Sequence, residues 1–64
     1  MEDRLFKTFM TLSDTVNDSH EDFAKFQGGN KSAGTRIRKR MQEIKILAQR
    51  VRIQVQEEKN AVTA

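Results

Sequence analysis

The sequence contains no cysteine and a single histidine, so neither a disulfide framework nor the common zinc patterns can hold the fold together. It also lacks proline, tryptophan and tyrosine, and its three glycines, Gly28, Gly29 and Gly34, lie close together near the middle. No apolar run approaches the roughly 20 residues that span a membrane, and the N-terminus lacks the basic start and apolar core of a signal peptide. These absences predict a cytoplasmic chain with one break in otherwise continuous helix, no cofactor and no membrane partner.

No set of residues suggests catalysis. His20 has no cysteine or second histidine to act with, and we interpret it as a surface or boundary side chain. The acidic residues of the first half lack the alternating spacing of a calcium loop, and we interpret them as a solvated helical face. We therefore expect no enzyme, no bound metal and no small-molecule substrate.

Two heptad patterns dominate the chain, one on each side of the glycines. Both step alternately by four and three residues, the spacing that keeps one helix face against a partner helix. The first pattern comprises Leu5, Phe9, Leu12, Val16, Ser19, Phe23 and Phe26. The second comprises Ile37, Met41, Ile44, Ala48, Val51 and Val55. We expect the two patterns to face each other, with the four phenylalanines used for packing rather than for stacking on bases.

The segment Gly28-Gly29-Asn30 separates the two patterns. Glycine tolerates the left-handed conformation that ends a helix, and Asn30 or Ser32 can cap the next one. A short link of this kind favours antiparallel neighbours. The prediction is an all-α single domain over 1–64: helix 3–27, turn 28–30, helix 31–59 and a frayed tail 60–64.

A hairpin of this size has little core, and a partner subunit is the stabilising element that remains. Three further aliphatic residues of the second helix, Ile46, Leu47 and Ile53, lie outside its heptad pattern. They either are scattered surface side chains or form a second interface. We favour an interface, and a homo-oligomer, most simply a dimer that completes a four-helix bundle.

Charge divides the chain at the same place. Residues 1–27 hold six acids and three bases, whereas residues 28–64 hold nine bases and three acids. Such asymmetry indicates a polyanionic partner for the second half. Arginine outnumbers lysine there by five to four, and arginine suits bidentate contact with phosphate.

The cations of the second helix form a stripe. Arg38, Lys45, Arg52 and Lys59 recur every seven residues, and a row of uncharged Gln42, Gln49 and Gln56 runs beside them. Three more cations lie at the start of the stripe and widen it: Arg36, Lys39 and Arg40. Lys31 lies beside the turn. The alternative is that the stripe is only a solvated face, because acids of the first helix could neutralise its beginning.

The turn is a second candidate site. Asn30, Lys31, Ser32 and Gly34 lie at a helix N-terminus, where free amides favour phosphate, and Gly34 lets either a DNA strand or the first helix approach closely. The simpler interpretation is an ordinary cap, with a small residue packed on the first helix.

The order Gly29-Asn30-Lys31-Ser32-Ala33-Gly34-Thr35-Arg36-Ile37-Arg38-Lys39, followed by Met41-Gln42-Glu43-Ile44-Lys45, resembles the bacterial histone H1-like proteins, with the chlamydial nucleoid histone as the best-known type. The resemblance covers about residues 23–57. It implies DNA binding, nucleoid compaction and self-association through the helices, and it places Asn30, Lys31, Arg36, Arg38 and Lys39 in the family's core motif. The chain lacks the Lys/Ala-rich tail of the chlamydial type, so we expect it to resemble the short members and to bind through its helices alone.

The leading hypothesis is a small nucleoid-associated protein that binds duplex DNA, or RNA, through phosphate contacts with little sequence preference. The residues expected to contact nucleic acid are Asn30, Lys31, Arg36, Arg38, Lys39, Arg40, Lys45 and Arg52. The rival hypothesis is a helical oligomerisation or adaptor module without nucleic-acid binding. A helix lying on anionic membrane is less favoured, because the second helix lacks aromatic anchors.

Overall fold

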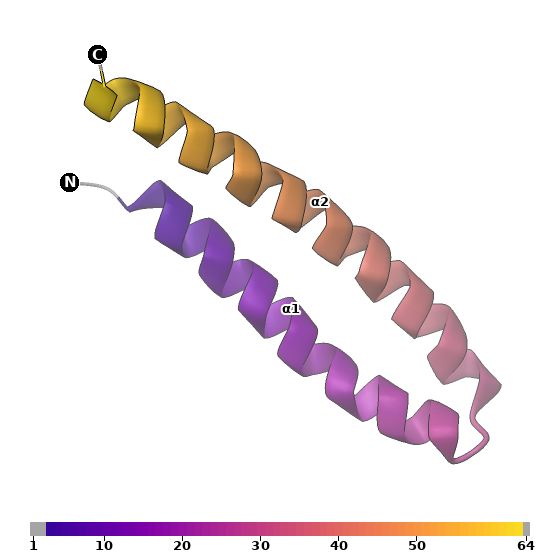
Figure 1. Cartoon of the computed structure of the whole chain (residues 1–64). Helices are drawn as coiled ribbons and strands as arrows, with labels where there is room; N and C mark the ends of the chain where they lie inside the picture. Colours follow the sequence, from indigo (N-terminus) through magenta and orange to yellow (C-terminus); the bar gives the residue numbers. More distant parts are fainter. Residues whose placement is uncertain (1–2, 64) are drawn as a thin grey trace.

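The computed structural model describes residues 3–63, with side chains described as far as Ala61. It consists of two helices, α1 (Arg4–Gln27) and α2 (Lys31–Thr63), which lie side by side, with the start of α1 and the end of α2 at the same end of the hairpin (Figure 1). This arrangement confirms the predicted all-helical hairpin. The molecule is a rod of 53 × 17 × 12 Å, so both helices run along its long axis.

The helix bounds lie close to those expected. Asp3 caps α1 rather than joining it, because its Oδ1 accepts a hydrogen bond from the Phe6 amide at 3.0 Å. α2 continues to Thr63, past the expected end at residue 59. No glycine or proline follows Lys59 to stop it, so residues 60–63 are helical where a frayed tail was expected. Residue 64 of that tail lies outside the described residues.

The turn between the helices is tight and fully hydrogen-bonded at its backbone amides. Gly28, Gly29 and Asn30 donate to the carbonyls of Ala24, Phe26 and Lys25 at 3.0–3.1 Å. Gly29 has a φ of 100°, the left-handed region that side chains disfavour. The turn therefore depends on glycine at this one position.

The helices meet along faces rotated from those expected. On α1, Leu5, Leu12 and Ser19 face α2 as predicted, but the alternate contacts come from Thr8, Thr15 and Asp22. The expected Phe9, Val16 and Phe23 are instead 51%, 39% and 43% exposed. Because each of these is one position beyond the residue that replaces it, a small rotation of α1 exchanges one row for the other.

α2 shows the same rotation. Ile37, Ile44 and Val51 face α1 as expected, and Ala48 is half-buried. Met41 and Val55 are 40% and 39% exposed, whereas Leu47 is half-buried and Gln54 is buried. The interface between the helices thus contains more polar side chains than the two heptad patterns predict.

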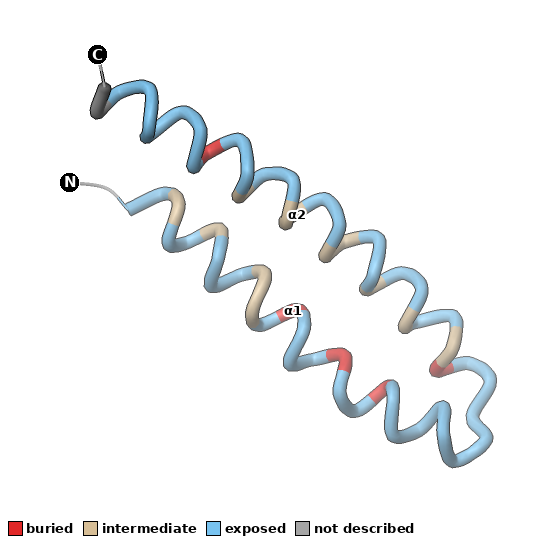
Figure 2. The backbone as a smooth tube through the Cα atoms, viewed as in Figure 1, coloured by how far each residue is buried: buried red, intermediate tan, exposed pale blue. Residues whose placement is uncertain are grey.

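Two hydroxyl side chains are buried in this interface. The hydroxyls of Thr15 and Ser19 donate to the carbonyls of Thr11 and Val16, so these side chains are buried with their donors satisfied. Among the described residues, Ala33 is the only apolar residue that is buried, and most of the tube in Figure 2 has the pale blue of exposed residues. All four phenylalanines are 43–53% exposed, so the expectation that they are used for packing is met inside the hairpin only in part, by Phe26 against Gly34. The hairpin has almost no apolar core of its own.

Candidate nucleic-acid interface

Eight of the nine cations of α2 form two groups on different sides of the helix; the ninth, the exposed Arg50, belongs to neither. One group, here called the basic row, repeats every seven residues: Lys31, Arg38, Lys45, Arg52 and Lys59. The other, the turn-side cluster, comprises Arg36, Lys39 and Arg40. Arg36 and Arg38 are two residues apart, about 200° around an α-helix, so they point to different sides. The eight residues predicted from sequence do not form one surface.

All five side chains of the basic row are exposed. The described part of the chain shows no ion pair to Lys31, Arg38, Lys45 or Arg52. Arg52 Nη1 instead donates to Gln49 Oε1 of the neighbouring amide row at 3.4 Å. The acids of α1 therefore leave these four cations available, which was the open question about the stripe.

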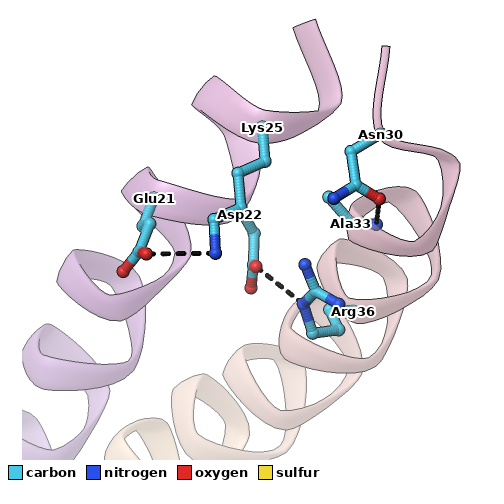
Figure 3. A network of polar contacts seen from close by, with 6 residues as sticks. All are labelled: Glu21, Asp22, Lys25, Asn30, Ala33 and Arg36. Atoms are coloured by element: carbon cyan, nitrogen blue, oxygen red, sulfur yellow. Dashed lines mark hydrogen bonds and ion pairs between the residues drawn. The ribbon is translucent and has the colours of Figure 1, made fainter. Parts of the chain in front are cut away.

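The turn-side cluster is partly neutralised. Arg36 Nε donates to Asp22 Oδ1 across the two helices at 2.8 Å, close to the turn (Figure 3). Arg40 Nη1 lies 3.6 Å from the Glu43 carboxylate of its own helix. Arg36, Lys39, Arg40 and Glu43 line a shallow depression of about 180 Å³. Three bases and one acid leave a cationic surface there, but two of the three arginine and lysine side chains already have a carboxylate.

The ion pair with Asp22 fixes the position of Arg36 but still leaves this arginine able to bind a phosphate. Its side chain is 46% exposed, while that of Asp22 is only 11% exposed. The contact uses Nε, one of the five guanidinium N–H donors. The other guanidinium donors have no ion pair among the described residues, so the pair with Asp22 holds the arginine at the surface.

The turn resembles an ordinary cap more than an anion site. Asn30 Oδ1 accepts a hydrogen bond from the Ala33 amide at 3.3 Å (Figure 3), and Asn30 O accepts from the same amide at 3.2 Å. Gly34 faces the ring of Phe26, since a Cβ added there would come 2.8 Å from Phe26 Cε1. The first helix, rather than a space for DNA, thus occupies the opening beside Gly34. Lys31 remains exposed next to the cap.

A feature missed by sequence reasoning is an open groove along one side of the hairpin. It has a volume of about 510 Å³ and is lined by residues of both helices: Val16, Ser19, His20, Phe23, Ala24, Gln27, Met41 and Ile44. Arg38 and Lys45 lie three and four residues from Met41 on α2, so the basic row borders this groove. The signal was present in the heptad pattern itself, whose residues pack only partly inside the hairpin.

The predicted interface residues differ in their surroundings. Ile46 and Ile53 are 51% and 49% exposed, whereas Leu47 is half-buried between the helices. Within residues 3–63, no group of three or more histidine, cysteine or acidic side chains could hold a metal ion. Neither helix, over the same residues, has a segment long and apolar enough to cross a bilayer.

Comparison with known families gives a match that covers most of the chain. The model of the family described as Histone H1-like protein Hc1 matches residues 6–61. The chain belongs to this family. No curated protein and no solved structure matches the chain significantly. The resemblance seen in the sequence from Gly29 to Lys45 is therefore confirmed, and the match extends through both helices.

Membership has a direct functional meaning. Histone H1-like proteins are DNA-packaging proteins of the nucleoid and are not known as enzymes. The family thus implies DNA as the partner and the nucleoid as the location. It does not by itself say which surface of the hairpin meets DNA.

Proposed function

We propose that this protein packages DNA by binding the duplex through phosphate contacts made by α2, with little sequence preference and as a homo-oligomer. The observation that carries the proposal is the basic row, of which Lys31, Arg38, Lys45 and Arg52 are exposed and have no acidic partner among the described residues. Phosphate groups are the polyanion that the family's partner presents along its whole length.

The length of the basic row suits a duplex. Seven residues of α-helix rise by about 10.5 Å, so the row from Lys31 to Lys59 extends about 42 Å. Duplex DNA rises 3.4 Å per base pair, so this distance corresponds to about 12 base pairs, or slightly more than one turn. A straight rod that lies along a duplex of this length meets phosphates at each point where one of the two DNA strands crosses the rod. The row therefore supports contacts spaced along the duplex axis.

The amide row beside the cations supports the same orientation. Gln42, Gln49 and Gln56 are exposed and uncharged, and amides, like bases, can donate to phosphate oxygens. None of these side chains lies at the end of a short helix that could enter the major groove and read base edges. Contacts of this kind fix position on the duplex without specifying sequence.

The turn-side cluster and the cap provide a second, weaker contact. Arg36, Lys39 and Arg40 line one depression, and Asn30 and Lys31 lie at the turn that precedes them in the chain. Because carboxylates hold Arg36 and Arg40, we expect these residues to add less affinity than the basic row. RNA duplexes offer the same phosphates, so binding to RNA is an expected secondary activity.

A direct test is a titration of the protein against a 30-base-pair duplex by fluorescence anisotropy at several salt concentrations. Each phosphate neutralised contributes about −0.9 to the slope of log affinity against log salt, so engagement of the five-residue row gives a slope near −4.5. Two duplexes of unrelated sequence should bind with affinities within a factor of about three. A slope near zero, or a strong preference for one sequence, would overturn the proposal.

A second candidate function, the adaptor module without nucleic-acid binding, is favoured by one observation: the exposed apolar groove between the helices. The same titration separates the two, because an adaptor would retain its self-association and show no salt-dependent binding to DNA.

A further inference from the structure

One long face of the hairpin is apolar and uncovered. It carries Phe9, Val16 and Phe23 from α1, together with Met41 and Val55 from α2, and each of these is 39–51% exposed. The groove lies on this face, and its lining includes Val16, Phe23 and Met41. The face follows the heptad spacing on both helices, so it continues along the rod rather than forming an isolated patch.

The hairpin exposes more surface than a compact monomer of its mass. The hairpin exposes 5272 Å². A compact monomer of 7.4 kDa exposes about 4,200 Å², so this one exposes about 1,100 Å² more than expected. A standard interface buries about 800 Å² on each partner. A second hairpin, also a rod about 53 Å long, has the length to cover the whole face.

The charges at the two borders of the groove distinguish between the ways in which two copies could pack face to face. The α2 border is the basic row, with Arg38, Lys45 and Arg52 beside Met41 and Val55. The α1 border holds no acidic or basic group except His20: it consists of Phe6, Ser13, His20 and Gln27. His20 and Gln27 line the groove, which places this border on the same face.

Two face-to-face arrangements with two-fold symmetry keep neighbouring helices antiparallel. If α2 lies over α2 of the partner, the two basic rows oppose each other and repel. If α2 lies over α1 of the partner, each basic row meets an uncharged border. The long stems of the row can then pack on the partner's Phe6 and Ser13, while their charged ends reach solvent.

We infer that a second copy of the chain covers this groove with α2 of each copy over α1 of the other, and that the resulting bundle carries its two basic rows on opposite sides, so that one dimer joins two duplexes. The two α2 helices occupy diagonal corners of such a bundle, and each row follows the border beside it. The joining of duplexes rests on the proposed DNA binding by the basic row; the arrangement of the two copies does not.

The absence of cysteine permits a clean test of the arrangement. The Asp22–Arg36 and Arg4–Glu57 contacts show that Ser13 lies at about the height of Lys45 along the rod. Ser13→Cys and Lys45→Cys are prepared as separately tagged full-length chains, mixed and oxidised without DNA. The inference expects a disulfide between the two different chains and little between two identical ones. A strong Lys45→Cys homodisulfide would place α2 on α2 and overturn it.

A second pair of variants tests the groove itself. Val16→Glu adds a charge in the groove, whereas Thr11→Glu adds the same charge to an exposed position on the other side of α1. Mass in solution should fall to that of one chain, 7.4 kDa, for Val16→Glu only, with helical circular dichroism retained in both. A dimer unaffected by Val16→Glu would contradict the inference.

Joining of duplexes is measured by retention of a labelled duplex on beads that carry a different, unlabelled duplex. Wild type and Thr11→Glu should retain the labelled duplex. Retention by Val16→Glu should be at least tenfold lower, although anisotropy should show that this variant still binds one duplex. Mixed-chain disulfides without retention would overturn the joining of duplexes. A wild-type monomer that binds DNA with steep salt dependence would overturn the whole inference, and the homo-oligomer with it, but would leave the proposed phosphate contacts of α2 intact. A dimer that binds no DNA would instead remove the proposed function.

Discussion

The Asp22 carboxylate lies 2.8 Å from the Nε of Arg36 and joins the two helices near the turn, where the Asp22 side chain is only 11% exposed. This contact settles part of the competition between the acids of α1 and the bases of α2. Arg36 pairs with an acid of α1, whereas the four cations of the basic row from Lys31 to Arg52, on another side of α2, meet no acid of α1 among the described residues. The distribution of charge therefore follows from how α1 is rotated against α2.

Replacement of Asp22 by asparagine should have opposite effects on stability and on DNA affinity. Loss of a charged hydrogen bond should lower the free energy of unfolding by about 1–2 kcal/mol. The same change removes one negative charge and releases Arg36, so affinity for DNA should rise. Urea unfolding at one protein concentration and anisotropy measure the two effects.

Asp18→Asn is the matched control for this charge change, because Asp18 is exposed. It should alter stability by less than about 0.5 kcal/mol. An equal loss of stability in both variants would show that the Asp22–Arg36 contact has no specific role.

Substitution of Gly34 should depend on Phe26. Alanine is favoured over glycine in a helix by about 0.5–1 kcal/mol, but its Cβ would come 2.8 Å from Phe26 Cε1. In the wild-type background these effects oppose each other, so Gly34→Ala should change stability little. In a Phe26→Ala background the clash is absent, and the same substitution should stabilise by about 1 kcal/mol. Urea unfolding of the single and double variants measures the coupling free energy between positions 34 and 26. The absence of coupling would contradict this packing.

Alanine should be tolerated at Gly28 and not at Gly29. Gly29 has a φ of 100°, which an alanine adopts only with strain, whereas Gly28 has a φ of −81°. We expect Gly29→Ala to lower the free energy of unfolding by about 1–2 kcal/mol. A Cβ at Gly28 would make ordinary contacts of 3.5–3.6 Å with the carbonyls of Lys25 and Ala24. Thermal unfolding that ranks the two variants in the reverse order would show a different turn.

Gln54 contains a polar atom whose burial should be costly. The residue is 8% exposed, and its Oε1 has no hydrogen-bond partner among the described residues. Gln54→Leu removes this acceptor and adds apolar surface between the helices, so it should stabilise by about 1–2 kcal/mol. Gln42→Leu, at an exposed position, should leave stability nearly unchanged. Destabilisation by Gln54→Leu in urea would mean that its oxygen is satisfied in solution.

The fold could be predicted from sequence to a large extent. The heptad spacing and the glycines at 28 and 29 gave two antiparallel helices because each signal is local. The rotation of α1 could not be predicted. Thr8 and Phe9 are neighbours, and a heptad pattern does not distinguish a face that packs inside the hairpin from a face that packs on another chain.

The same rotation limited how much of the candidate site could be predicted from sequence. The seven-residue spacing of Arg38, Lys45 and Arg52 was enough to place these cations in one row. Whether Arg36 meets a carboxylate depends on which side of α1 carries Asp22 toward α2. Proximity in sequence therefore grouped Arg36 with Arg38, although the helix points them to different sides.

The central claim is that the basic row carries the binding of DNA. The measurement that tests it most directly compares the salt dependence of duplex binding for two triple variants with the same loss of charge. The first variant changes Arg38, Lys45 and Arg52 to glutamine, and the second changes Arg4, Lys7 and Lys25 of α1 to glutamine. We expect the first variant to make the log–log slope shallower by about 2.7 and the second to leave it within about 0.5 of wild type. Equal changes in the two variants would show that only net charge matters and would contradict a defined binding face on α2.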